Sequence, residues 1–308
     1  MNAQPYDVVI VGGGAAGLSA ALVLGRARRR VAVIDSGAPR NAPAAHMQGY
    51  LSRDGLPPSE LLAIGRAEVT SYGVELIDDA VVSVDPLDPG FTVRLSSGQA
   101  LTARRLLVAT GVTDHVPDLP GVRERWGRDL LHCPYCHGWE VRDQPLGVLG
   151  ANPESIVFAQ LLRGWSDDLI YFAHTQEPTE AEALALAARG IRVVPGEVAR
   201  LVIEDDHLTG VELADGEVIP RSAVFVRPVI TPHPDYLLAA LGCALDATGF
   251  AVVDSTGRTS VPGVWGAGNA VDPRAQVITA AGAGSAAAIA INADLLQDDI
   301  ALAVQTGQ

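Results

Sequence analysis

A glycine-rich turn between an apolar strand and a small-residue helix restricts the fold of this chain more than any other feature. Residues 8–11 form an unbroken run of Val and Ile, typical of a parallel strand buried on both faces. Gly12, Gly14 and Gly17 follow in the spacing G-x-G-x-x-G, and a helix is expected over 15–26. This order predicts a Rossmann-like βαβ unit at the start of the chain.

Each glycine of this motif has a physical task in a dinucleotide site. Gly12 permits a tight turn, Gly14 lets the backbone approach a pyrophosphate, and Gly17 lets helix and strand pack closely. The helix N-terminus favours phosphate charge. Asp35 ends a second expected strand, 18 residues after Gly17, and can accept hydrogen bonds from ribose hydroxyls. A glycine-rich turn of another α/β fold is the alternative, but the complete order favours a dinucleotide.

Composition limits the other possibilities. The 308 residues allow two domains, and 36 acidic against 22 basic residues, all arginine, give a net charge of −14. Nucleic acid is therefore an unexpected partner, because phosphate binding needs a basic face. The Ala- and Gly-rich segment 278–291 is too short to span a membrane, and the N-terminus lacks the basic region of a signal peptide. We expect a cytoplasmic protein without a membrane partner.

A cluster of two cysteines and two histidines lies in "LLHCPYCHGWE", residues 130–140. A Cys-x-x-Cys pair can be a redox disulfide, half of a zinc site or, with a following histidine, a c-type haem attachment site. Zinc needs a second ligand pair, whereas Cys243 stands alone and is expected to be an inert buried thiol. A close pair in a reducing compartment favours catalysis, so we expect a redox disulfide and no metal.

Two later motifs complete a family pattern. Ala-Thr-Gly ends an expected strand at 103–111, and "TSVPGVWGAGNA" at 259–270 precedes a long Ala-rich helix that begins near Pro273. In this order the motifs resemble those of the two-domain flavoprotein disulfide reductases of the low-molecular-weight thioredoxin reductase branch, over nearly the whole chain. The resemblance implies an α/β homodimer with two Rossmann-like, doubly wound, three-layer domains. A discontinuous FAD domain would comprise 1–114 and 245–308, and the inserted domain 115–244 would carry the Cys-x-x-Cys.

The resemblance implies FAD as the cofactor. Asn269 stands where the family usually has an aspartate against the ribityl chain, and an amide can still bind a hydroxyl. The start of the Ala-rich helix corresponds to the segment beside the flavin pyrimidine, although plain core packing is the alternative for this helix. The implied FAD contacts are Gly12, Gly14, Ala16, Gly17, Asp35, Ser36, Arg40, Asn41, Thr110, Gly111, Gly268, Asn269, Ala275, Gln276 and Val277.

The same resemblance gives roles to the cysteine cluster. Cys136 would face the flavin and Cys133 would meet the substrate. His137 stands where the reductases have an aspartate, directly after the second cysteine, and histidine can take protons from a thiol near neutral pH. His132 is a second candidate base. Either histidine can instead be an ordinary hydrogen-bonded residue near the surface.

The inserted domain departs from the reductase pattern at its own glycine motif, "PLGVLGANPES" at 145–155. Gly147 and Gly150 are retained, but Asn152, Pro153 and Glu154 replace the small residues that a close approach needs. Glu154 would repel a pyrophosphate, and no arginine cluster follows the next strand to hold a 2′-phosphate. The segment therefore predicts a Rossmann-like domain with a degenerate NADPH site.

A flavin–disulfide enzyme without NADPH must take electrons from its thiol substrate. This pattern, with "CPYCHGWE" and the segment 35–55, resembles the FAD-dependent dithiol oxidases of gliotoxin- and holomycin-type pathways. It implies closure of an intramolecular disulfide in a small-molecule dithiol, with oxygen as acceptor, and places Asn41 near flavin and disulfide unless Asn41 is a plain loop residue. An NADPH- or ferredoxin-driven reductase of a thioredoxin-like protein and a flavin-bound redox sensor are the alternatives.

Overall fold

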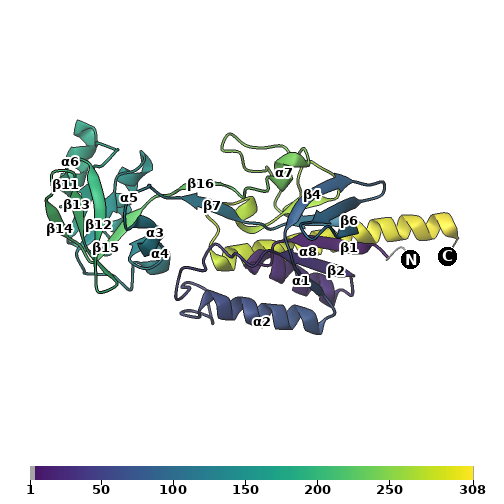
Figure 1. Ribbon diagram of the computed structural model, residues 1–308. Helices are drawn as coiled ribbons and strands as arrows, with labels where there is room; N and C mark the ends of the chain where they lie inside the picture. Colours follow the sequence, from purple (N-terminus) through teal and green to yellow (C-terminus); the bar gives the residue numbers. More distant parts are fainter. Residues whose placement is uncertain (1–3, 308) are drawn as a thin grey trace.

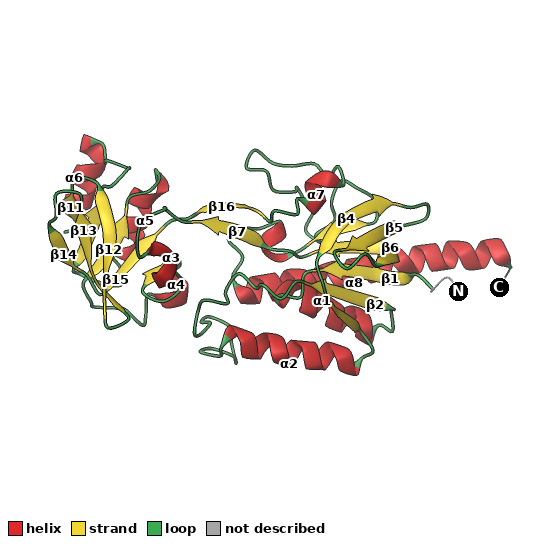
Figure 2. Cartoon of the chain, viewed as in Figure 1, coloured by secondary structure: helices red, strands yellow, loops and turns green. Residues whose placement is uncertain are grey.

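Two α/β lobes joined by a narrow ribbon make up the protein (Figures 1 and 2). The computed structural model describes residues 4–307. The ribbon pairs β7, Val112–His115, antiparallel with β16, Val229–Pro232. The chain leaves the first lobe along β7 and returns along β16, so the first lobe is discontinuous in sequence.

The first lobe contains a sheet with the strand order β3-β2-β1-β6-β5-β4, and β17 also pairs with β6. Neighbours among β3, β2, β1, β6 and β17 are parallel, whereas β4, β5 and β6 pair antiparallel. The glycine motif begins where β1 ends, at the carboxyl edge of the parallel strands, where ligands bind in such sheets. The strands are β1 Tyr6–Val11, β2 Val31–Asp35, β3 Glu75–Asp78, β4 Val81–Pro86, β5 Phe91–Leu95, β6 Ala100–Val108 and β17 Val264–Gly266.

Helices α1, Ala15–Arg26, and α8, Val277–Thr306, pack side by side on one face of this sheet (Figure 1). Their backbones approach closely, because a Cβ on Gly284 would lie 2.0 Å from the Ala16 carbonyl oxygen. Helix α2, Pro58–Ser71, packs beside α1. On the other face, α7, Leu237–Ala240, and Cys243 are buried against the strands, so the expectation of a buried Cys243 is confirmed.

The second lobe has a parallel sheet of order β11-β10-β9-β15-β8 beside an antiparallel sheet β12-β13-β14. The predicted α/β class with two Rossmann-like lobes is confirmed. The elements are α3 Val122–Arg125, β8 Leu130–Leu131, α4 Pro134–His137, β9 Leu146–Leu149, α5 Glu154–Leu162, β10 Leu169–Phe172, α6 Glu180–Ala188, β11 Arg192–Val194, β12 Val198–Glu204, β13 His207–Leu213, β14 Val218–Pro220 and β15 Ala223–Val226.

The lobe boundaries lie near the ribbon. The limits expected from the sequence, 1–114, 115–244 and 245–308, remain a proposal. The expected boundary between residues 114 and 115 lies within β7, where the chain passes from the first lobe to the second. At the return crossing, Leu237, Leu238 and Cys243 belong to the core that contains Val9 and Leu106 of the first sheet. This packing favours a boundary at β16, before residue 233.

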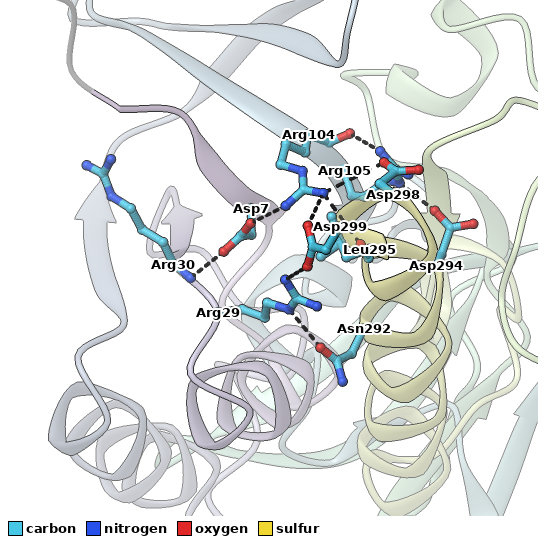
Figure 3. Close-up of polar contacts among 10 residues, drawn as sticks. All are labelled: Asp7, Arg29, Arg30, Arg104, Arg105, Asn292, Asp294, Leu295, Asp298 and Asp299. Atoms are coloured by element: carbon cyan, nitrogen blue, oxygen red, sulfur yellow. Dashed lines mark hydrogen bonds and ion pairs between the residues drawn. The ribbon is translucent and has the colours of Figure 1, made fainter. Parts of the chain in front are cut away.

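Helix α8 is twice as long as the segment 278–291 suggested, because it continues to Thr306. By length and composition alone it could cross a membrane. One face of it packs on the first lobe, and the opposite face is exposed. Small residues of its first half are buried against α1, and acidic residues of its second half pair with arginines of the first lobe. Figure 3 shows this second contact, in which Asp299 accepts from Arg29 and Arg104, each at 2.7 Å.

Candidate active site

A cleft of about 1790 Å³, measured to its open mouth, runs along the carboxyl edge of the first sheet to the cysteine turn of the second lobe. Seventeen of the nineteen residues predicted for the site line it. Gly17 and Cys133 do not. The lining residues among those predicted are Gly12, Gly14, Ala16, Asp35, Ser36, Arg40, Asn41, Thr110, Gly111, His132, Cys136, His137, Gly268, Asn269, Ala275, Gln276 and Val277.

The first glycine turn has the geometry of a dinucleotide cradle. Gly12 has φ +105°, and a Cβ there would lie 2.4 Å from the Ala109 carbonyl oxygen. A Cβ on Gly17 would lie 1.9 Å from the Gly12 oxygen, so Gly17 acts in packing and not in lining. A Cβ on Gly14 would meet nothing within 4 Å. Its open side therefore faces the cleft, at the N-terminus of α1, where a pyrophosphate fits.

The adenosine end of such a ligand has a matching acid. Asp35 ends β2 at the cleft wall, and its Oδ2 would lie 2.7 Å from a Cβ on Gly13. Arg66 Nη1 is 3.4 Å from the same oxygen, too long for a strong pair. The carboxylate thus keeps accepting capacity for ribose hydroxyls.

The start of α8 closes the other end of the cradle. Gln276 is the N-cap of α8, and the short 3₁₀ turn η1, Gly268–Ala270, precedes it. Asn269 Nδ2 donates to the carbonyls of Asp272 and Ala275 at 2.9 and 3.0 Å. An aspartate could not make these two bonds, because a carboxylate only accepts. Asn269 therefore also holds the α8 start in place, a task the sequence did not reveal.

Arg40 connects the cleft to the ribbon. Its Nε and Nη2 donate to Asp114 Oδ2 and Oδ1, both at 2.6 Å, and Asp114 lies on β7 with its side chain 7% exposed. Nη1 lies 3.4 Å from Asn269 Oδ1. Bidentate pairing of this kind is geometrically specific. Arg40 thus fixes the loop after β2 to the strand that leads into the second lobe.

Cys133 and Cys136 form a disulfide with a Cα–Cα distance of 5.2 Å. Cys133 is the N-cap of the one-turn helix α4, and Cys136 lies within that turn. Only Cys136 lines the cleft. Of the two cysteines, it is therefore Cys136 that borders the dinucleotide cradle.

Burial makes both flanking histidines weak bases. It lowers the pKa of His132 to about 4, with the Arg40 charge as the next cause. His132 also stacks on Trp126, with ring centroids 5.3 Å apart. Burial likewise lowers the pKa of His137, against the opposing charge of Glu140. Both imidazoles are neutral at pH 7 and available to accept a proton.

Several lining residues were not predicted from the sequence. His233 and Asp235 follow β16 and face the cleft, with His233 Nδ1 2.9 Å from Asp235 Oδ2. This hydrogen bond raises the pKa of His233. No motif surrounds the pair, so only the return of the ribbon reveals its position. Within residues 4–307, His, Cys, Asp and Glu form no cluster of three or more suited to a metal.

At the corresponding turn of the second lobe, hydrogen bonds join the loops that border the crevice. The Thr175 backbone N–H and Oγ1 both lie within reach of the Gly150 carbonyl oxygen, at 3.1 and 3.3 Å. Asn152 Nδ2 donates to the Arg227 carbonyl at 2.8 Å. Glu154 occupies the first turn of α5, where phosphate would approach. The residues present do not fit a bound NADPH.

The fold and the cleft define a flavoprotein disulfide oxidoreductase, with an open dinucleotide cradle beside a redox disulfide. The chain belongs to the pyridine nucleotide-disulphide oxidoreductase family, whose sequence profile matches residues 6–285. FAD is the cofactor of the thioredoxin reductase-like members of this family. The predicted resemblance, enzyme class and cofactor are confirmed.

Individual relatives agree with this family. A probable thioredoxin reductase from Arthroderma benhamiae is 35% identical over 59% of this chain, which spans only 46% of that protein. The thioredoxin reductase sirT from Leptosphaeria maculans is 30% identical, with 96% of both chains covered. The crystal structure of HlmI superposes with a TM-score of 0.95 at 58% identity, covering 98% of this chain and 96% of HlmI.

Proposed function

We propose that the protein is an FAD-dependent dithiol oxidase that closes an intramolecular disulfide in a small molecule. The observation that carries the proposal is the contrast between its two dinucleotide crevices. The cradle beside Cys136 is open, whereas Thr175 and Asn152 are bonded across the crevice that would hold NADPH. Electrons must then enter through the disulfide and not from a nicotinamide.

The exchange at the disulfide balances without an external reductant. One substrate thiolate attacks the Cys133 sulfur, so a mixed disulfide forms and the Cys136 thiolate leaves. The second substrate thiolate attacks the mixed disulfide, which releases the cyclic disulfide product and the Cys133 thiolate. The enzyme dithiol then closes to the disulfide again. FAD bound in the cradle would supply the two-electron redox chemistry for this closure, and oxygen would be the final acceptor, becoming hydrogen peroxide with the two electrons and two protons of the dithiol.

The histidines accept the two protons that the substrate thiols lose. A thiolate is the reacting form, so a neutral base beside the disulfide raises the reactive fraction. His137 directly follows Cys136, and His132 directly precedes Cys133. Both are neutral at pH 7, so each has a free lone pair for a proton, but burial lowers both pKa values and makes them weaker bases than an exposed imidazole. Asn41, also in the cleft wall, is proposed to orient the reacting groups.

An NADPH- or ferredoxin-driven reductase is the second candidate. The names of sirT and of the Arthroderma protein favour it, since both are called thioredoxin reductases. The same sealed crevice argues against NADPH here, though not against ferredoxin. A flavin-bound redox sensor is the third possibility, and it predicts no turnover.

We infer a homodimer from the exposed face of α8, whereas the cytoplasmic location stays a prediction from the sequence. An apolar stripe runs along this face at spacings of three and four residues, so it lies on one side of the helix. The charged residues of α8 point instead to the first sheet, as Figure 3 shows. Light scattering of the native protein and of Ile300→Asp tests whether this stripe joins two copies. The exposed stripe comprises Ile278, Gly282, Ala286, Ile289, Ala293, Leu296, Ile300 and Val304.

An anaerobic titration of the yellow protein tests the function. NADPH is added first, then dithiothreitol, and flavin absorbance is followed before air is admitted. We expect NADPH to leave the flavin oxidised, dithiothreitol to bleach it, and air to restore it with peroxide formed. Cys136→Ser is the control and should not bleach. Prompt bleaching by NADPH would establish the reductase, and an absence of turnover in air would establish the sensor.

A further inference from the structure

The histidines of the cleft fall into two groups with opposite surroundings. His132 and His137 come from the second lobe, and burial lowers the pKa of each. His233 directly follows β16, where the ribbon enters the first lobe (Figure 1), and its bond to Asp235 raises its pKa. Titratable groups in one site whose surroundings separate their pKa values commonly divide the roles of base and acid. The cleft has proton acceptors on the second lobe, and the role of acid is open.

The contacts of Asp235 fix the ring of His233 in one orientation. Asp235 Oδ2 lies 2.9 Å from His233 Nδ1, and Oδ1 accepts from the Leu237 backbone N–H at 3.2 Å. The Asp235 N–H lies farther from the same ring nitrogen, at 3.4 Å. A carboxylate only accepts, so Nδ1 carries a hydrogen and Nε2 is left for another partner. Tyr236, next in the chain, has φ +47°, a conformation that is uncommon outside glycine and often marks active sites.

The pair borders both the cleft and the solvent. The side chain of His233 is 41% exposed and that of Asp235 is 15% exposed, and both line the cleft. Because the ring borders both, it can regain from water a proton that it gives up in the cleft. The more buried carboxylate keeps the ring in place during this exchange.

Asp235 is the charge that acts on His233. Both residues line a small pocket beside the end of β6, in which no other described side chain is charged. Elsewhere in the cleft wall, Arg40 is paired with Asp114, and His132 and His137 are neutral. The remaining titratable groups of that wall are Asp35 and Asp79, which follow β2 and β3, His46 in the loop after β2, and Cys136.

We propose that His233 is the general acid of the reaction with oxygen and that Asp235 positions it. This inference rests on the proposed oxidase function and deepens it, because it names the group that gives a proton to the acceptor. Oxygen takes two electrons and two protons to become hydrogen peroxide. The electrons are those of the enzyme dithiol. One proton passes from His233 Nε2 to the reduced oxygen, the second comes from water, and the ring is protonated again by solvent. A cationic ring also stabilises the negative charge that develops on oxygen.

The experiment measures the two half-reactions separately. Enzyme is reduced without oxygen, once with dithiothreitol and once with dithionite, and is then mixed with oxygenated buffer while flavin absorbance is followed. The variants are His233→Gln and Asp235→Asn, in which the amide oxygen can still accept from the Leu237 N–H. His115→Gln is the matched control, because His115 lies on the same ribbon, bonded to Thr231, and does not line the cleft.

We expect reoxidation of His233→Gln to slow by about 100-fold, the usual contribution of a general acid, while bleaching by dithiothreitol keeps its native rate. Asp235→Asn should slow reoxidation by about tenfold, because the ring stays but its orientation and charge are less well held. His115→Gln should match native enzyme in both steps. A native reoxidation rate in His233→Gln overturns the proposal, as does equal slowing of bleaching and reoxidation. If His233→Gln does not retain flavin, a native reoxidation rate in Asp235→Asn overturns it.

Nitrogen NMR of the histidine side chains gives a readout that needs no turnover and no flavin. One histidine should stay protonated to a higher pH than His132 and His137, vanish in His233→Gln and titrate at lower pH in Asp235→Asn. A His233 that titrates together with His132 contradicts the role of acid.

Reduction by dithionite separates this inference from the proposed function. If dithiothreitol does not bleach native enzyme, but dithionite-reduced enzyme reacts with oxygen and His233→Gln slows that reaction, the dithiol oxidase proposal fails while the acid role stands. If dithiothreitol bleaches the enzyme and reoxidation is equally fast in native enzyme and His233→Gln, the acid role fails while the oxidase stands.

Discussion

The two glycine turns of this protein are built alike and surrounded differently. At the β1–α1 turn, a Cβ on Gly14 would meet nothing within 4 Å. At the β9–α5 turn, the position that corresponds to Gly14 is Asn152, whose Nδ2 donates to the Arg227 carbonyl at 2.8 Å. Gly150 corresponds to Gly12, and both are tight: a Cβ would lie 2.6 Å from the Ala173 carbonyl oxygen in the second turn and 2.4 Å from that of Ala109 in the first. The first turn therefore has a glycine where a ligand would approach, whereas the second has at that position an amide side chain bonded to the protein's own backbone. A retained glycine therefore does not by itself mark a retained site.

The largest expected effect comes from filling the open turn. In Gly14→Val the new side chain would occupy the place of a pyrophosphate, and FAD affinity should fall by about 100-fold or more. Gly14 has φ −76°, which valine accepts, so only the N-cap preference is lost, about 1 kcal/mol. The flavin-to-protein absorbance ratio and the melting temperature of flavin-free protein check this. A variant that keeps its flavin would show that the cradle lies elsewhere.

A substitution in the second glycine turn should instead lower stability and leave the flavin content unchanged. Gly150→Ala forces a methyl group against backbone oxygens, and overpacking of this kind costs about 1–3 kcal/mol. Because no cofactor is expected at this turn, the flavin content should match that of the native protein. Urea unfolding measures the loss. Normal stability together with a gain in NADPH binding would contradict the sealed crevice.

The glycine turn between β1 and α1 could be predicted almost completely from the sequence. For the turn between β9 and α5, the sequence predicted a degenerate NADPH site but not the contacts made there. Gly12, Gly14 and Gly17 lie within one strand, turn and helix, so their spacing carries the information. Asn152 and Glu154 indicated a damaged site. Thr175 and Arg227, which bond to Gly150 and Asn152, lie in loops after two other strands. His233 and the amide bonds of Asn269 were missed for the same reason, since contacts between distant segments leave no periodic pattern.

Each of the two crevices has a buried histidine, so the stability of the protein should depend on pH through both. Burial lowers the pKa of His132 in the open cleft and of His174 beside the sealed one. The unfolded chain then binds protons at a higher pH than the native one, so stability falls as pH drops below about 6.5. For His132 the loss continues to about pH 4. Each histidine contributes a slope of at most about 1.4 kcal/mol per pH unit.

Substitution separates the two histidines. His132→Phe keeps the ring on Trp126, should remove part of the acid slope and, if His132 accepts protons, should also slow turnover. His174→Asn suits the φ of +47° at this position and should alter only the slope, because Val198 N–H donates to His174 Nδ1 far from the disulfide. Urea unfolding and oxygen uptake from pH 4.5 to about 7 test both. Equal slowing of turnover by the two variants would contradict the proposal that only His132 accepts protons in the reaction.

The smallest expected effect lies at the end of α8 away from the cleft (Figure 3). Asp299 joins Arg29 and Arg104, and its side chain is 38% exposed. Exposed pairs contribute little, so Asp299→Asn should cost about 1 kcal/mol or less, with a smaller loss in high salt. The first turn of α8 at the cradle is held separately, by the Asn269 bonds to Asp272 and Ala275. Flavin content and turnover should therefore stay native in Asp299→Asn, and their loss would show that the far end of the helix supports the site.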